Sequence, residues 1–145
     1  MENYNLDHDI PVMYVTASSF PEGICEAHDQ LHSRVSFRGE RHFFGISRPE
    51  GGLHNIVYKA AAEQLNENEA REYGLESLII PKGMYRSMYI SDYAKDPQLI
   101  GQAFEQLLDN PSILDPNGYC IEMYIGKSDV RCMIRLNAKN GELKM

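Results

Sequence analysis

The stretch that decides the fold is Tyr119-Cys120-Ile121-Glu122-Met123-Tyr124-Ile125, followed by Gly126-Lys127-Ser128 and a second apolar run over residues 129–136. Two β-prone runs that are separated by a short glycine-containing segment predict a β-hairpin. Glu122 interrupts the first run, and an ionised carboxylate loses several kcal/mol, roughly, when it leaves water without a partner. We therefore expect Glu122 to meet either a cation of the protein or a ligand.

Upstream of this hairpin, the sequence predicts a strand over residues 84–91 and a helix that begins at Asp96-Pro97. Asp and Pro are typical of a helix start, because Asp caps the first turn and proline's missing N–H costs least there. The helix has one apolar stripe, formed by Ile100, Ala103, Phe104, Leu107 and Leu108. Residues 84–136 are thus predicted to form a βαββ unit.

The first part of the chain shows the same order of elements. Residues 10–18 predict a strand, and Pro21 opens a helix that is expected to end at Arg38-Gly39. Its apolar face is formed by Ile24, His28, Leu31 and Val35. Strands are predicted at residues 42–47 and 56–62. Residues 60–73 are rich in Ala, Glu and Gln, which favours helix, but the apolar spacing is irregular, so a strand that runs into a loop is the preferred interpretation.

Two βαββ units, at about residues 10–62 and 84–136, indicate an α+β fold within one domain that spans residues 1–145. The expected arrangement has antiparallel sheets with helices on one face. The other faces of the two pseudo-twofold halves would then meet as a ligand cleft.

Composition narrows the classes of function. The formal net charge is −7 and no cluster of Lys and Arg is present, which argues against direct binding of nucleic acid. No apolar stretch approaches the roughly 20 residues that span a bilayer, so no membrane partner is expected. Three widely spaced cysteines favour reduced thiols and a cytoplasmic location. Phosphate-loop, nucleophile-elbow and dinucleotide motifs are absent, so no cofactor is predicted.

The candidate ligand-binding residues follow from strand alternation. Cys120, Glu122 and Tyr124 share one face of the predicted strand, and the aliphatic residues on its other face are expected to pack under the helices. Further cleft residues are expected to be Tyr85, Tyr89, Tyr58 and Phe44. A carboxylate among aromatic rings suits an organic cation, because each ring adds roughly 0.5–2 kcal/mol.

Alternatives to a ligand remain open for Glu122 at this point. It could form a structural ion pair with Arg131, Arg135 or Arg86, or act as a general acid or base if burial raises its pKa. Cys25, His28 and His32 have the helical spacing of a zinc site. However, His28 lies in the apolar stripe, so packing is preferred and no metal is predicted.

Short motifs along the chain resemble the GyrI-like small-molecule-binding family, which includes the effector-binding domains of bacterial multidrug-responsive transcription regulators. The resemblance is carried by Pro81-Lys82-Gly83-Met84-Tyr85, the helix from Pro97, and Glu122-Met123-Tyr124. Phe44-Gly45-Ile46-Ser47 and Tyr58-Lys59-Ala60 resemble the first-half strands of the family.

This resemblance implies a duplicated βαββ fold in which Glu122 lies at the centre of a cleft and meets cationic aromatic ligands. It implies a stand-alone binding domain, because no helix-turn-helix segment precedes it, and it adds the possibility of a homodimer or a partner protein such as DNA gyrase. Some relatives are hydrolases that open cyclopropane-bearing toxins with a Glu and a Trp. This chain has no Trp, so binding without catalysis is the preferred interpretation, and Glu122 is the catalytic candidate otherwise.

Overall fold

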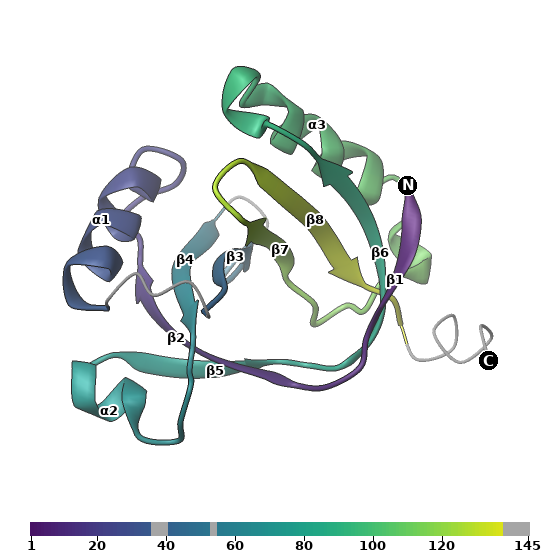
Figure 1. The fold of residues 1–145 in the computed structure, drawn as a ribbon. Helices are drawn as coiled ribbons and strands as arrows, with labels where there is room; N and C mark the ends of the chain where they lie inside the picture. The colour runs from purple at the N-terminus through teal and green to yellow at the C-terminus, as the bar shows by residue number, and fades with distance from the viewer. Residues whose placement is uncertain (36–40, 53–54, 138–145) are drawn as a thin grey trace. The chain divides into compact units, whose positions relative to one another are not determined.

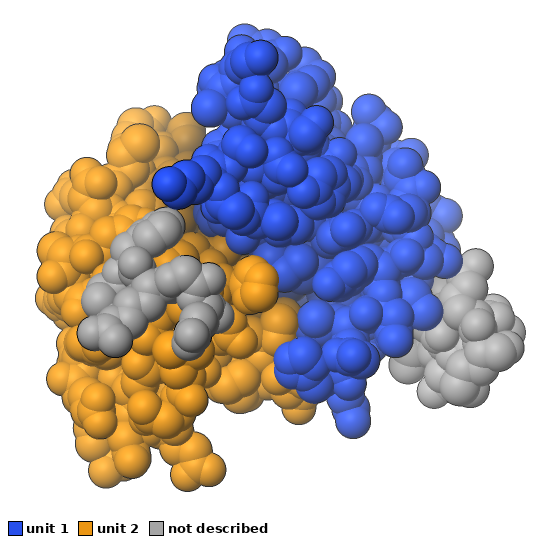
Figure 2. Space-filling view, in the orientation of Figure 1, with its two compact units in different colours: residues 1–8, 81–145 blue, residues 9–80 orange. Residues whose placement is uncertain are grey.

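The two βαββ repeats that the sequence predicts are present, together with further strands and short helices. The computed structural model describes residues 1–35, 41–52 and 55–137, and the chain divides into two compact units: unit 1 is Met1–His8 with Pro81–Met145, and unit 2 is Asp9–Ile80 (Figure 2). The fold is α+β with antiparallel strands, as predicted.

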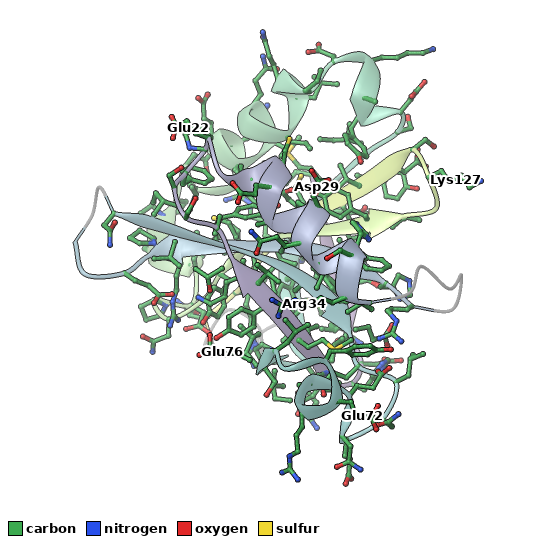
Figure 3. The ribbon with its side chains drawn as sticks, turned by 90° about the vertical axis from the view of Figure 1, so that its left-hand side faces the viewer. Glu22, Asp29, Arg34, Glu72, Glu76 and Lys127 are labelled. Atoms are coloured by element: carbon green, nitrogen blue, oxygen red, sulfur yellow. The ribbon has the colours of Figure 1, made fainter. Side chains whose placement is uncertain are left out.

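Unit 2 contains the first βαββ repeat, β2 (Ile10–Thr16), α1 (Ile24–Arg34), β3 (Phe43–Pro49) and β4 (Ile56–Glu63). A short helix, α2 (Glu69–Tyr73), and strand β5 (Glu76–Ile80) follow, and the strand order is β3-β4-β2-β5. Helix α1 packs against β2 and β4 and buries Ala27 and Leu31. Figure 3 shows α1 from its solvent side, where the exposed residues Asp29 and Arg34 lie.

Unit 1 contains the second repeat, β6 (Gly83–Ile90), α3 (Gln98–Leu107), β7 (Cys120–Ile125) and β8 (Asp129–Arg135). Two short 3-10 helices flank α3, namely η1 (Tyr93–Lys95) and η2 (Pro111–Ile113). The strand order is β1-β6-β8-β7, and α3 packs against β6 and β8 (Figure 1).

The core of unit 1 lies between α3 and one face of this sheet. Its buried members are Ile90, Ala103, Leu107, Leu114, Val130, Cys132, Ile134 and Leu136. Each fully buried Leu or Ile contributes about 1.5–3 kcal/mol of hydrophobic free energy, so α3 is held mainly by its apolar stripe. Leu108 was predicted to belong to that stripe, but it is 46% exposed, because α3 ends at Leu107.

Each unit is completed by a strand that lies outside the βαββ repeats. β1 (Glu2–Leu6) precedes β2 along the chain but pairs with β6, and β5 precedes β6 but pairs with β2. The sequence analysis missed β1. The polar sequence of β1 carries little strand signal, and its partner lies about 80 residues away, so its pairing is set by tertiary structure.

The ambiguous segment over residues 60–73 resolves into two elements. β4 continues to Glu63, which confirms the strand, and the short helix α2 follows within the part that was expected to be a loop. Gly74 ends α2 in the left-handed conformation (φ 68°), which glycine adopts without steric cost. The predicted helix end at Arg38-Gly39 lies outside the described residues, while α1 ends at Arg34.

Within the described ranges, none of the helices has the length and apolar character that crossing a membrane would require. The cleft expected between the two halves stays a prediction.

Candidate functional site

Glu122 lies in the middle of β7, on the face of the unit 1 sheet that α3 covers. In the β7–β8 ladder, Glu122 is paired with Cys132, and Tyr124 is paired with Val130. Paired residues of an antiparallel ladder point to the same face. Cys132 and Val130 belong to the core under α3, and Cys120 and Tyr124 pack against it. Glu122 is half-buried at the margin of this core.

The predicted assignment of the two faces of β7 is therefore wrong. The aliphatic residues were expected to pack under the helix, but Ile121 and Met123 lie on the opposite face, where both are buried. Met133 and Tyr85 are buried on that face as well. Both faces of the strand are thus largely apolar, so alternation separates the two sets of residues without showing which one the helix covers.

Tyr124 and Tyr93 provide aromatic surface next to Glu122. The Tyr124 hydroxyl donates a short hydrogen bond to Oε1 of Glu122. The ring of Tyr93, in η1, lies 5.7 Å from the ring of Tyr124 between centroids, a distance typical of favourable aromatic pairs. The sequence analysis missed Tyr93 because it belongs to neither repeat strand. Its place between β6 and the Asp96-Pro97 helix start was the only available signal.

The charge of Glu122 affects the titration of its neighbours. Burial, assisted by the negative charge of Glu122, raises the pKa of Tyr93. The same two causes raise the pKa of the Cys120 thiol to about 11. For Cys132 they raise the pKa to about 12, and Cys120 adds to the effect. The site therefore disfavours further negative charge, and its thiols stay protonated at neutral pH.

The three arginines considered as partners of Glu122 make their ion pairs elsewhere. Arg131 and Arg135 extend from the face of β8 opposite to Cys132. Arg131 pairs with Glu2 at 2.8 Å, and Arg135 pairs with Asp115 at 3.4 Å. Arg86 pairs with Asp109 at 3.0 Å.

Tyr85 and Tyr89 do not line the face that carries Glu122. Both point to the opposite face of β6, because Tyr85 is paired with Arg135 and Tyr89 with Arg131. Tyr85 is buried, and its hydroxyl donates to the carbonyl oxygen of Pro81 at 2.5 Å. Tyr89 is 43% exposed. The alternation within β6 was correctly predicted, but its relation to β7 depends on the register with β8.

In unit 2, Tyr58 and Phe44 lie on different faces of the sheet. Phe44 is paired with Ala61, whereas Tyr58 is paired with Ser47, and both side chains are buried. The Tyr58 hydroxyl lies 2.9 Å from Nε2 of His28 on α1. Tyr58 thus faces the helix, and Phe44 belongs to the other side.

Further aromatic rings extend this contact on the α1 face. The exposed ring of Phe20 is stacked on Tyr58 with 6.1 Å between centroids. The ring centroid of His32 lies 6.3 Å from that of His28 and 4.7 Å from that of Phe43. Burial, and then the proximity of His32, lowers the pKa of His28 to about 4.

The structure gives no support for a metal ion at the helical Cys25, His28 and His32 set. Cys25 is exposed, and His28 already contacts Tyr58. Across the ranges that the structure describes, no group of three or more His, Cys, Asp or Glu side chains is arranged to hold a metal.

Comparison with known proteins places the chain by its fold alone. No protein-family model matches the sequence, and no curated protein matches it. Among solved structures, an integron cassette protein from the mobile metagenome of Vibrio cholerae aligns with a TM-score of 0.63 at 9% identity, covering 94% of this chain and 95% of that one.

Two further structures are similar to this chain. SAV2435, whose structure was solved bound to tetraphenylphosphonium, aligns with a TM-score of 0.66 at 9% identity, covering 95% of this chain and 94% of that one. A hydrolase from Listeria innocua aligns with a TM-score of 0.52 at 8% identity, covering 94% of this chain and 90% of that one.

Proposed function

We propose that this chain is a small-molecule-binding protein of the GyrI-like kind, and that it binds a flat or bulky aromatic cation at Glu122 on the α3 face of unit 1. The observation that carries the proposal is the group formed by the half-buried Glu122 carboxylate and the rings of Tyr124 and Tyr93. The similarity in fold to SAV2435, which was solved with a bound aromatic cation, supports it.

The residues of this group have separate roles in the proposal. Glu122 provides the negative charge that orients a cation. The same charge is the second cause, behind burial, of the raised pKa values of Tyr93, Cys120 and Cys132. Tyr124 and Tyr93 present ring faces whose quadrupoles attract a cation, with roughly 0.5–2 kcal/mol for each ring. Tyr124 also fixes the carboxylate through its hydroxyl.

The size of the charge effect follows from Coulomb's law. A cation centre about 6 Å from the carboxylate gains about 0.7 kcal/mol in bulk water and about 2.8 kcal/mol at an effective dielectric constant of about 20. Since about 1.4 kcal/mol corresponds to tenfold in affinity, loss of the Glu122 charge is expected to weaken binding by about threefold to 100-fold.

The test is a calorimetric titration of tetraphenylphosphonium into the wild type, Glu122→Gln and Glu105→Gln. Glu105 is an exposed residue of α3 in the same unit, so Glu105→Gln removes the same formal charge away from the site. We expect weaker binding only for Glu122→Gln. Equal affinities for all three proteins, or no binding by the wild type, would contradict the proposal.

A second candidate function at the same residues is hydrolysis of an electrophile, and the contact between Tyr124 and Glu122 favours it. In this alternative Glu122 accepts a proton from an attacking water, and the Tyr124 hydroxyl stabilises the charge that develops on the leaving group. Mass spectrometry of a cyclopropane-bearing alkylator incubated with the wild type and Glu122→Gln separates the two functions. Product that forms with the wild type alone supports hydrolysis, and its absence supports binding without turnover.

A further inference from the structure

Tyr93 lies in the short segment that joins β6 to α3, outside the strands of the repeat. Tyr93 follows Asp92, which has a left-handed backbone with φ 52°, the only such non-glycine residue in the described part of the chain. Asp tolerates this conformation better than most residues that have a side chain, and within the segment the Lys95 N–H donates to the carbonyl oxygen of Asp92 at 3.2 Å. These local contacts shape the turn but do not fix the Tyr93 ring relative to Tyr124, so the position of the ring needs a restraint from another element.

The restraint comes from the turn between β7 and β8. The backbone N–H of Asp92 donates to Oδ1 of Asp129 at 3.0 Å, and the N–H of Tyr93 donates to the carbonyl oxygen of Ser128 at 3.0 Å. Two consecutive backbone N–H groups are thus bound to two consecutive residues, Ser128 of the turn and Asp129 at the start of β8.

The Asp129 carboxylate is itself fixed by two hydroxyl groups. The Tyr89 hydroxyl donates to Oδ2 at 2.6 Å, and the Ser128 hydroxyl donates to Oδ1 at 3.0 Å. The hydrogen bond from Tyr89, followed by those from Asp92 and Ser128, lowers the pKa of Asp129. The carboxylate therefore stays ionised at neutral pH and accepts all three hydrogen bonds.

We propose that Asp129 is a positioning residue for the Glu122 site, because it clamps the Asp92-Tyr93 segment to the β7–β8 turn and so holds the Tyr93 ring against Tyr124. Tyr89, which points away from Glu122, acts on the site through Asp129 rather than by contact with a ligand. The consequence for binding rests on the proposed function, whereas the consequence for the ring geometry does not.

The first test therefore needs no ligand. In a nuclear Overhauser spectrum, the wild type is expected to show cross-peaks between the ring protons of Tyr93 and Tyr124. These cross-peaks should be lost in Asp129→Ala. They should remain in Asp129→Asn, because the amide oxygen still accepts from Asp92 and Ser128. If Asp129→Ala does not fold, Tyr89→Phe replaces it as the variant, with weakened cross-peaks expected. Unchanged cross-peaks in the variant that folds would overturn the proposal.

The second test measures the affinity for tetraphenylphosphonium. Asp129→Ala is expected to bind about threefold to tenfold more weakly, a loss that lies within the roughly 0.5–2 kcal/mol contributed by one aromatic ring. Asp129→Asn should bind within about twofold of the wild type. In a Tyr93→Ala background, Asp129→Ala should cause no further loss. A loss of the same size in that background would overturn the role of Asp129 as a positioning residue. No binding by the wild type would instead contradict the proposed function, and the ring cross-peaks would still test the clamp.

Discussion

Protonation of His28 is expected to destabilise the fold. The His28 side chain lies between α1 and the sheet of unit 2, with Nε2 2.9 Å from the Tyr58 hydroxyl. Burial and the nearby His32 lower its pKa from 6.5 to about 4, and Asp29 opposes this shift. The folded protein thus keeps His28 neutral over a range of pH in which the unfolded chain binds a proton.

The sign and size follow from linkage. Because the pKa is lower in the folded state, the contribution of His28 to stability is complete above about pH 6.5 and is lost as the pH falls toward about 4. Integration between these two pKa values gives a loss of about 2 kcal/mol at pH 5 and about 3 kcal/mol at pH 4.

The assay is urea unfolding of the wild type and His28→Gln between pH 7.5 and pH 4. Glutamine keeps a donor and an acceptor for Tyr58 but does not titrate. Carboxylates whose pKa is lowered by ion pairs, such as Glu50 and Glu69, act equally in both proteins and cancel in the difference. His8→Gln, at an exposed histidine, serves as the control. We expect the wild type to lose about 3 kcal/mol more than His28→Gln. Parallel stability curves would refute the reasoning.

Two further predictions concern the Arg41–Glu69 ion pair and the three cysteines. Glu69→Ala should lower the free energy of unfolding by about 3–5 kcal/mol, because it leaves the Arg41 guanidinium, whose side chain is 3% exposed, without its carboxylate; a loss below about 1 kcal/mol in urea unfolding would contradict this. In thiol labelling of the native protein at pH 8, the exposed Cys25 should react first, whereas Cys120 and Cys132, whose pKa values are raised to about 11 and 12, should react only on unfolding. Equal rates for all three cysteines would be inconsistent with protonated thiols that are buried at Cys132 and partly buried at Cys120.

The repeat architecture could be predicted because its signals are local. Asp96-Pro97 marks a helix start within one or two residues of α3, and Gly126-Lys127-Ser128 joins β7 to β8. The strand β4 could also be chosen over a helix. In contrast, β1 has a polar sequence and is stabilised by pairing with β6. Its strand character therefore arises from a contact with a distant part of the sequence, which the residues around β1 do not reveal.

The candidate site was predicted in part. Glu122 and Tyr124 do lie together, because residues two apart on a strand share a face. The sequence could not show which face of the sheet Tyr85 and Phe44 occupy, because their strands carry apolar residues on both faces. Only the register with the neighbouring strands decides which face meets the helix. Tyr93 was missed because its position is set by the β7–β8 turn rather than by its own element.

The central claim is that the negative charge of Glu122 selects a cationic aromatic ligand. Tetraphenylphosphonium and tetraphenylborate have nearly the same shape and opposite charge, so the ratio of their affinities isolates the electrostatic contribution. The account predicts that the wild type prefers the phosphonium by at least about tenfold and that Glu122→Gln loses most of this preference. A ratio near one in the wild type, or the same preference in Glu122→Gln, would contradict it.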